Sequence, residues 1–545
     1  MSNSSIRKVF LPINLAFDNP EAKKLCDFLN LLNKSGVLLL LKSPSSKGRP
    51  PFKAENLFAT CIYGFAFNSP TLRELETSCK FDLRYKFLME NEEPTYQTFS
   101  QFLNDTIKPN IDKIFHLITK QIATEMNLNI HEYAFIDGTK FEADCNKYKF
   151  VWKPTTFHKK VTEKVIEILK QFNLDRDIKS DELITSKIVA QKITQLSSLN
   201  VDENLIKTKN KSLKILLEKL EKVLEYEEKE TICGPHRNSY YKTDYDATAM
   251  CLKDDYYAGL GSSMHAAYST QIVVSNYLIT SFLVSQERSD MKDFIKVLQV
   301  YYENYHCYPR KICADAGYGS EENYKFLSEN RIKSFVKFQS WEGNKSGKNP
   351  DRYYLFEDGY IKCLYGRIGH EVKIDYNRRY KNSTFYKIFN CSYCEVNNYC
   401  KLFMNEENKS KSYKVFEVKK DFTLLKQINE TNLLSIEGIE MRVNRSMQVE
   451  GAYGVVKQNL SYNRLRRTGM DSVKTEIALT FLDYNLRKYF SYLNGKIIKT
   501  YWYAPVDALP ESFKNPRFKI LQRRTFKKDV QPNKKIKKEY RSKRK

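Results

Sequence analysis

Apolar residues recur at helical spacing through the first part of the chain, residues 13–125. Leu25, Leu29 and Leu32 fall on one face of a helix, and the same spacing resumes after the Gly- and Pro-containing stretch 48–51. The pattern predicts a compact helical N-terminal module. Such helices bind DNA or mediate dimerisation, and the sequence leaves both roles open.

Two short apolar runs, each followed by an aspartate, predict buried strands. Residues 133–136 precede Asp137, and residues 311–314 precede Asp315. We expect the first run to turn there into a second strand, which would put Asp137 at a strand end or a sheet edge. Because these runs and the β-branched stretch 266–284 alternate with helical patterns, the region is predicted to form an α/β sheet.

Two segments interrupt the α/β pattern. Residues 159–240 have a helical pattern whose leucines are spaced like a helix-pairing seam, which favours a scaffold or a dimer arm. These leucines are Leu213, Leu217, Leu220 and Leu224. Residues 341–435 are polar, rich in Tyr and Asn, and are interpreted as a second insertion. A helical pattern resumes near Asn444 and continues into a long apolar helix that begins at Ser472.

The charge balance narrows the classes of partner. The 545 residues contain 90 Lys and Arg against 65 Asp and Glu, a formal charge of +25, which favours a polyanionic partner such as nucleic acid. Residues 514–545 hold 15 of these cations and two acids, so they supply 13 of the 25 excess charges. We expect this tail to neutralise phosphates nonspecifically or to serve only solubility.

One cysteine cluster has the spacing of a metal site. Cys391, Cys394 and Cys400 form a C-x2-C-x5-C pattern, for which Cys363 is the best fourth ligand and His370 the second choice. A structural zinc would stabilise a segment that has few apolar residues of its own. The alternative is a set of unligated thiols in a loop.

Three acids have a shared chemical logic. Asp137 and Asp315 each follow a buried strand, and Glu450 lies in a predicted helix with Lys457 two turns later. Each acid alone is more often a cap or a solvated residue. Together they could supply the hard oxygen ligands that two divalent ions require for phosphodiester chemistry, while Lys457 contacts phosphate.

The sequence around these acids resembles bacterial insertion-sequence DDE transposases. The matching segments are FIDGTKFEADCNKYKFVWK from Phe135, ADAGYGSEENYKFL from Ala314 and NRSMQVEGAYGVVKQNLSYNRLRRTG from Asn444. In addition, GRPPF, SPTLRELETSC and EEPTYQTFSQF, between residues 48 and 102, resemble the InsH-like N-terminal module of such transposases. The resemblance covers about residues 45 to 490.

The resemblance implies a ribonuclease-H-like catalytic core, a mixed sheet with flanking helices, that binds two Mg²⁺ or Mn²⁺ ions. Asp137, Asp315 and Glu450 correspond to the catalytic, metal-binding acids of the family. Related groups carry Lys seven positions after the Glu, as Lys457 does here, and Arg four positions before it. Ser446 occupies that earlier position, so Arg445 is the nearest arginine.

Further residues are assigned by the same resemblance. Arg445, Lys457, Arg464 and Arg467 are candidate DNA-binding residues. The acids Asp244, Asp246 and Asp290 are expected either to support the site from behind the metal ligands or to serve as turn and capping residues. His265 is expected to be a packed histidine, because two-metal chemistry does not require a histidine base.

The predicted organisation places two insertions within one catalytic core. The segments are a helical DNA-binding or dimerisation module at 1–125, core parts at 126–158, 241–340 and 436–495, a helical insertion at 159–240, a Cys-containing insertion at 341–435 and a basic tail at 496–545.

The expected function is metal-dependent DNA cleavage at the ends of an insertion sequence, followed by strand transfer into target DNA. The expected partners are terminal inverted repeats, target DNA and a second copy of the chain, in a bacterial cytoplasm and on the nucleoid. No run of 18 apolar residues is present, which excludes a predicted membrane span. The alternatives are a catalytically silent, transposase-derived DNA-binding regulator and a two-metal nuclease without strand transfer.

Overall fold

The computed structural model describes most of the chain. The described residues are 20–41, 52–67, 71–178, 182–201, 203–235, 237–252, 259, 263–345, 353–356, 358–363, 365–373, 380, 382–394, 413–460, 462–496 and 501–503. The residues predicted to form the basic tail lie outside these ranges, apart from residues 496 and 501–503, and so does Cys400.

The N-terminal segment is helical, as its apolar spacing predicts. Its α-helices are α2 (Pro20–Ser35), α3 (Ala54–Phe67), α4 (Leu72–Phe81), α5 (Leu83–Met89), α6 (Tyr96–Phe102) and α7 (Lys108–Glu125). Thr71 begins α4 with a capping box, because its hydroxyl accepts from the Glu74 amide while the Glu74 carboxylate accepts from the Thr71 amide. Buried apolar side chains of these helices join the core that continues into the central sheet.

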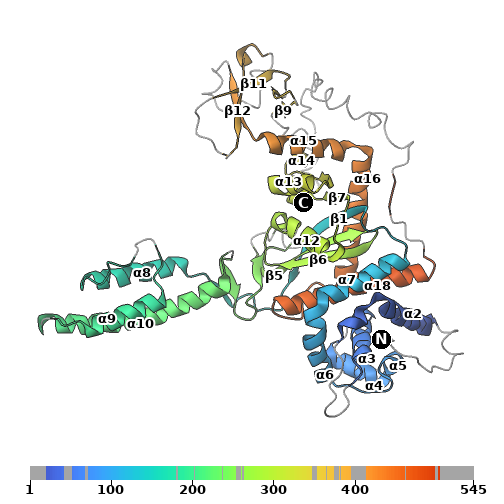
Figure 1. The fold of residues 1–545 in the computed structure, drawn as a ribbon, viewed down its shortest axis with the longest axis horizontal. Coiled ribbons are helices and arrows are strands. Elements are labelled where there is room, and N and C mark those ends of the chain that lie inside the picture. The colour runs from blue at the N-terminus through green and yellow to red at the C-terminus, as the bar shows by residue number, and fades with distance from the viewer. Residues whose placement is uncertain are drawn as a thin grey trace, which may run out of the picture.

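A mixed sheet forms the centre of the molecule (Figure 1). Its strands are β1 (Tyr133–Glu142), β4 (Thr248–Met250), β5 (His265–Ser275), β6 (Leu278–Ser285), β7 (Lys311–Ala314) and β8 (Lys333–Val336). Strand β5 pairs antiparallel with β1, β4 and β6, whereas β1, β7 and β8 run parallel. The helices α12 (Asp290–Tyr305) and α13 (Glu321–Glu329) connect β6 to β7 and β7 to β8. The predicted α/β class with a mixed sheet is confirmed.

Asp137 lies inside a strand, and the prediction that the chain turns there is wrong. Strand β1 runs without interruption for ten residues, because β5 pairs with it from Phe135 to Glu142. Its parallel neighbour β7 is shorter and ends at Ala314, opposite Ile136. Asp137 therefore lies where β1 extends past the end of β7.

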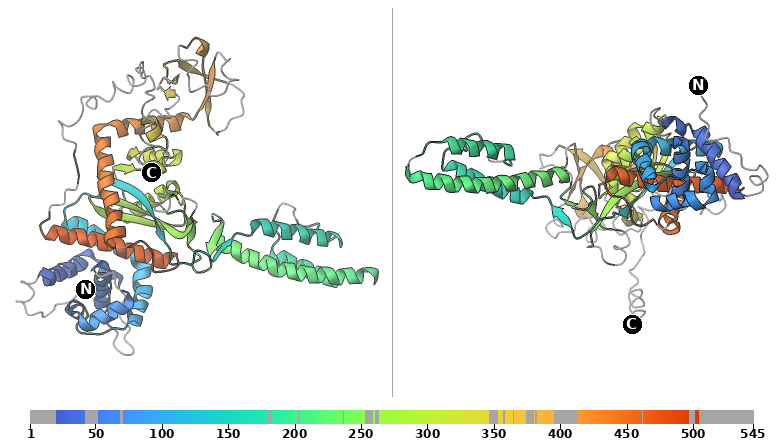
Figure 2. Two further views of the ribbon diagram at one scale, coloured as in Figure 1. Left: turned by 180° about the vertical axis from the view of Figure 1, so that it is seen from behind. Right: turned by 90° about the horizontal axis from the view of Figure 1, so that it is seen from below.

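The insertion after β1 forms a projecting helical arm, seen at its full length in Figure 2. It contains α8 (Thr155–Lys170), α9 (Ser186–Ser198) and α10 (Glu203–Cys233), which share a core of their own. The short strands β2 (Phe150–Trp152) and β3 (Ser239–Tyr241) pair at its base. The predicted leucine seam is divided: Leu213 and Leu220 pack against this core, whereas Leu217 and Leu224 are exposed.

The Cys-containing segment includes a second, smaller sheet. Its antiparallel strands are β9 (Tyr353–Leu355), β10 (Ile361–Cys363), β11 (Ile368–Val372), β12 (Thr384–Ile388) and β13 (Lys414–Val418). This sheet lies at the end of α15 (Lys420–Leu434), apart from the central sheet (Figure 1). A separate core of buried side chains holds it together.

The C-terminal helices return to the central sheet. Helix α16 (Ile436–Arg445) continues through the π-turn η7 (Ser446–Glu450), helix α17 (Gly451–Gly454) and a second π-turn, η8 (Val455–Asn459). Helix α18 (Met470–Leu493) then packs against α3, α7 and β6. Among the described residues, no helix combines the length and the apolarity needed to cross a membrane.

Candidate active site

Two of the predicted acids follow neighbouring residues of adjacent parallel strands. Ile136 of β1 and Ala314 of β7 are register partners, and Asp137 and Asp315 are the residues that directly follow them in sequence. Asp315 begins the 3-10 turn η3 (Ala316–Tyr318), and the Asp137 side chain accepts a hydrogen bond of 2.9 Å from the Gly138 amide. The carboxyl end of β7 thus brings both acids to the same part of the sheet.

The third acid comes from the C-terminal helices. Glu450 ends the π-turn η7, which packs against β1 and β5. Its side chain is 60% exposed and accepts a hydrogen bond of 3.0 Å from the Ser446 hydroxyl. π-turns inside helices occur preferentially at functional sites.

Arg445 connects the acids. Its guanidinium, 11% exposed, lies 3.4 Å from Asp137 Oδ2 and 3.8 Å from Glu450 Oε1. Burial lowers the pKa of Arg445, but Asp137, Cys313, Asp315 and Glu450 together raise it above its ordinary value. Arg445 therefore contacts Asp137 and Glu450 directly, and the charge of Asp315 acts on its pKa in the same direction.

The donor set of this cluster fits divalent cations. Three carboxylates provide the hard oxygen ligands that Mg²⁺ and Mn²⁺ prefer. Arg445 Nη1 is buried and makes no hydrogen bond to a described residue, so only a long ion pair holds it beside Asp137. As the side chains stand, no group of three or more His, Cys, Asp or Glu in the described part of the chain is arranged to hold a metal ion.

A layer of polar side chains supports β1 next to Asp137. Gln271 donates to Asp290 Oδ1 over 2.8 Å and accepts from the Tyr318 hydroxyl. A Cβ added at Gly138 would lie 2.5 Å from Gln271 Nε2 and 2.7 Å from Asp290 Oδ1, so only glycine fits between them. Asp290, predicted to support the site or to cap a helix, thus lies directly behind the residue that follows Asp137.

Tyr453 holds the Glu450 helix on the sheet. Its hydroxyl lies within hydrogen-bond distance of two carbonyl oxygens, 3.2 Å from Asp137 and 3.1 Å from Thr270. Burial, followed by the charges of Asp137 and Asp290, raises the pKa of the Tyr453 hydroxyl well above its ordinary value. The hydroxyl therefore stays protonated and remains a donor.

The candidate DNA-binding residues occupy different places. Lys457 Nζ donates to the Lys140 carbonyl of β1 over 3.3 Å and lies 5.2 Å from the centre of the Phe141 ring. Arg464 is exposed and pairs with Asp144. Arg467 lies over Phe65 in the N-terminal helices, a packing position rather than a place beside the acids. Arg445 and Lys457 thus flank the part of β1 that carries Asp137.

The remaining polar residues singled out from the sequence have structural partners. Asp244 accepts from the Tyr268 hydroxyl over 2.8 Å, and Asp246 accepts from the Met470 amide over 2.8 Å at the start of α18. His265 lies 3.4 Å from Glu142. These contacts agree with the packing and capping roles expected for them.

The cysteines of the second segment are only partly described. Cys391 is buried in the core of the small sheet, and Cys363 packs against the same core. Cys394 ends the 3-10 turn that starts at Cys391. Cys363 and Cys391 thus pack against the same apolar core, whereas His370 is exposed, and the zinc site stays a prediction.

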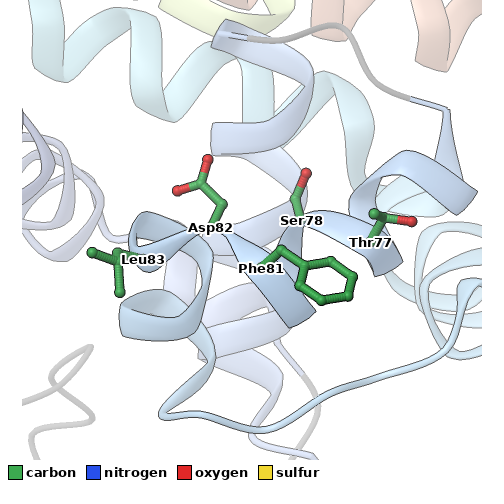
Figure 3. Close-up of a pocket in the computed structure, with 5 residues that line it drawn as sticks. All are labelled: Thr77, Ser78, Phe81, Asp82 and Leu83. Carbon is green, nitrogen blue, oxygen red and sulfur yellow. The ribbon is translucent and has the colours of Figure 1, made fainter.

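A surface pocket elsewhere does not belong to this site. It has a volume of about 480 Å³, is wide open to solvent, and lies between α4 and α5 (Figure 3). Its acid, Asp82, caps α5 through the Arg84 amide and also pairs with the Arg84 guanidinium. The pocket is therefore a surface feature of the N-terminal helices.

Sequence reasoning did not find Gln271, Tyr318 or Tyr453. Gln271 is buried in β5 but directly follows the polar residues Ser269 and Thr270, so the sequence gives no clear signal for it. The two tyrosines carry no signal in a chain that has 37 of them.

Acids gathered from two adjacent strands and one packed helix, on a mixed sheet, have the arrangement expected of a DDE-type nucleic-acid-processing domain. The family described as "Transposase DDE domain" matches residues 367–490, which include Glu450, Arg445 and Lys457. The family described as "Transposase domain (DUF772)" matches residues 17–105. No significant match was found among curated proteins or among solved structures.

Two separate segments of the chain thus match transposase domains, which confirms the resemblance seen in the sequence, and Asp137 and Asp315 lie between the two matches. The DDE match begins at residue 367, inside the segment interpreted as an insertion. The second half of that segment is therefore part of the matched domain. A DDE domain implies a ribonuclease-H-like core, and the mixed sheet agrees with it.

Proposed function

We propose that this protein is the transposase of a bacterial insertion sequence, which cleaves DNA at the element ends and transfers the strands into target DNA. One observation carries the proposal: Asp137 and Asp315 directly follow register partners of two adjacent parallel strands, and Arg445 lies 3.4 Å from Asp137 Oδ2 and 3.8 Å from Glu450 Oε1. A shared cluster of three acids is expected of a DDE catalytic site and is not needed for DNA binding alone.

Asp137, Asp315 and Glu450 would hold two Mg²⁺ or Mn²⁺ ions. When bound, such ions supply an activated water or 3′-hydroxyl and balance the charge on the leaving oxygen. Asp137 is fixed in β1, whereas the exposed Glu450 side chain can turn from Arg445 toward a ligand. Arg445 would then be free to face the phosphate of the DNA, which it can bind with two parallel hydrogen bonds.

The surrounding cations position the DNA in this proposal. Lys457 would exchange its hydrogen bond to the Lys140 carbonyl for a phosphate oxygen, and the exposed Arg464 would contact the backbone nearby. The N-terminal helices and the basic tail would supply further phosphate contacts. Two element ends must be cut in concert, so we expect a dimer or a larger assembly.

The test is cleavage and strand transfer of labelled element-end DNA by wild type, Asp137→Asn, Asp315→Asn and Glu450→Gln. Each variant removes a charge and keeps the side-chain shape. We expect a loss of cleavage of more than about a thousandfold with DNA binding unchanged. Asp112→Asn, which removes an exposed acid of α7 paired with Lys474, is the matched control and should cleave normally.

Two other functions give different results in this assay. A DNA-binding regulator would bind element ends without cutting them, even as wild type. A nuclease without strand transfer would cut but not join. Either outcome would overturn the proposal, and the cluster of acids favours the enzyme over the regulator.

A structural zinc in the small sheet is a separate proposal. Cys391 and Cys363 contribute to one core, and Cys394 follows directly in the chain. Thiolates are the preferred ligands of structural zinc. The ion would cross-link a sheet whose buried core contains only seven side chains among the described residues.

A further inference from the structure

The base of the helical arm presents an unusual group of aromatic side chains. Tyr148, Phe150, Trp152 and Phe157, within ten residues of sequence, are all exposed, with Tyr148 at 81% and Trp152 at 64%. Phe150 and Trp152 are two residues apart in β2 and therefore point to the same face, where the centres of their rings lie 5.4 Å apart. Large aromatic side chains in water mark a binding surface more often than a structural one.

The segment of sequence that carries these rings is basic. Residues 145–162 contain five lysines and no acid. Lys147 lies over the Tyr148 ring, with Nζ 5.5 Å from its centre, and Lys149 and Lys153 flank β2. Such a surface suits a ligand that offers flat apolar groups together with negative charge.

The paired strands β2 and β3, at the base of the arm, are held by hydrogen bonds. The Lys153 amide donates to the Asn238 carbonyl over 2.8 Å, and the Lys242 amide donates to Lys149 over 2.9 Å. Lys153 Nζ also binds the Gly234 carbonyl at the end of α10. The backbone that carries Phe150 and Trp152 is therefore fixed before any ligand arrives, which lowers the entropy cost of binding.

We propose that this surface, called the aromatic platform and formed by Tyr148, Phe150, Trp152 and Phe157, binds unpaired nucleotides of DNA. Bases would stack on the rings of Phe150 and Trp152, while Lys147 and Lys149 contact the phosphates. Stacking on aromatic side chains inside a basic surface is the physical basis of single-strand binding. The proposal rests on the proposed function for its choice of DNA, since DNA processing exposes unpaired strands.

The platform follows the catalytic strand directly along the chain. Strand β1, which carries Asp137, ends at Glu142, and β2 begins at Phe150. Between them, Asp144 pairs with Arg464, and the Leu465 amide donates to the Glu142 carbonyl. This short, anchored connection gives unpaired DNA at the active site a nearby surface to occupy.

The test compares two labelled DNA probes without divalent ions, a 20-nucleotide oligo(dT) and a blunt 20-base-pair duplex, by fluorescence anisotropy with the full chain. We expect Trp152→Ala to weaken oligo(dT) binding about tenfold and Phe150→Ala/Trp152→Ala to weaken it further. Duplex binding should change less than twofold. Trp152→Phe keeps a stacking ring and should stay within about threefold of wild type.

The matched control is Phe389→Ala. Phe389 is 49% exposed and has Lys387 Nζ 5.0 Å from its ring centre, but it belongs to the small sheet. Its loss should leave both probes unaffected. Equal oligo(dT) binding by wild type and Trp152→Ala, an equal loss on both probes, or the same loss in Phe389→Ala would each overturn the platform.

The results separate the two proposals. If the wild type cuts and joins element ends but Trp152→Ala binds oligo(dT) normally, the platform is refuted and the transposase stands. If Trp152→Ala loses oligo(dT) binding while the wild type neither cuts nor joins, the platform stands and the transposase proposal fails.

Discussion

Arg445 is the residue whose removal tests the site most directly. Its guanidinium lies 3.4 Å from Asp137 Oδ2, the oxygen that would hold a divalent ion. An ion bound by that oxygen would lie at most about 6 Å from the guanidinium. At this distance, and with the dielectric constant of water, the repulsion between charges of +1 and +2 is about 1.4 kcal/mol. Arg445→Ala should therefore bind Mn²⁺ about tenfold more tightly than wild type.

The same substitution should weaken the protein when metal is absent. Arg445 is buried and Asp137 is 17% exposed, so removing the cation leaves a largely desolvated carboxylate without its partner. Breaking a buried pair costs about 3–5 kcal/mol, and the long contact distance reduces this to about 2 kcal/mol. The exposed Glu450 contact adds little. We expect a lower unfolding temperature without metal and a larger stabilisation by Mn²⁺ than in wild type.

Isothermal titration calorimetry with Mn²⁺ measures the first effect, and thermal unfolding with and without Mn²⁺ measures the second. Arg445→Lys keeps the charge and should bind Mn²⁺ within about threefold of wild type. Asp137→Asn should bind it more weakly. Mn²⁺ binding by Arg445→Ala that is unchanged or weaker would show that Arg445 does not compete with metal at Asp137.

Three further predictions concern other parts of the molecule. Gly138→Ala forces a Cβ against Gln271 and should lower the free energy of unfolding by about 1–3 kcal/mol and reduce cleavage activity. Gly454→Ala, in a helix with open space around it, should raise the free energy of unfolding by about 0.5–1 kcal/mol. Equal unfolding temperatures of the two variants would contradict the packing argument. Burial raises the pKa of Asp483 to about 7 despite its ion pair with Arg487, so the folded state holds this proton more tightly than the unfolded state does. The stabilisation by this proton is complete below about pH 4 and is lost as the pH rises to about 7. The difference in unfolding free energy between wild type and Asp483→Asn should therefore change by about 4 kcal/mol between pH 4 and pH 8. A difference that stays constant with pH would refute the prediction. Finally, metal analysis of purified protein should find close to one zinc per chain, lost in Cys391→Ser, and zinc-free wild type would exclude the site.

Asp137 and Asp315 could be singled out because they directly follow buried residues, 133–136 and 312–314, and such a transition from apolar to acidic residues is visible in any sequence. The course of the backbone at Asp137 could not be predicted. Whether a strand ends or continues there depends on β5, which lies about 130 residues away in sequence and pairs with β1 as far as Glu142.

The role of Arg445 depends on a helical irregularity that periodicity does not reveal. In a regular α-helix, the residue four positions before Glu450 shares its face, and that residue is Ser446. The π-turn Ser446–Glu450 adds a residue to the turn, which brings Arg445, five positions away, to the same side. Arg445, one position before the place where related transposases carry their arginine, thus still reaches Asp137 and Glu450.

Hydrophobic periodicity also does not identify the partner of a helix. The leucines of α10 have the spacing of a helix pair, and two of them pack within the arm while Leu217 and Leu224 face water. The sequence gives the same pattern for contacts within one chain and between two chains. Only the three-dimensional placement of α8 and α9 shows which side of the helix they cover.

The distance in sequence between the acids has a consequence during synthesis. Glu450 is translated 313 residues after Asp137, which takes about 15–60 s at bacterial elongation rates of roughly 5–20 residues per second. The N-terminal domain and most of the sheet leave the ribosome before the last acid is made. In the proposed site, a chain whose synthesis stops before residue 450 therefore lacks one of the three acids, and a messenger truncated before that codon would yield a product that is unable to cut DNA.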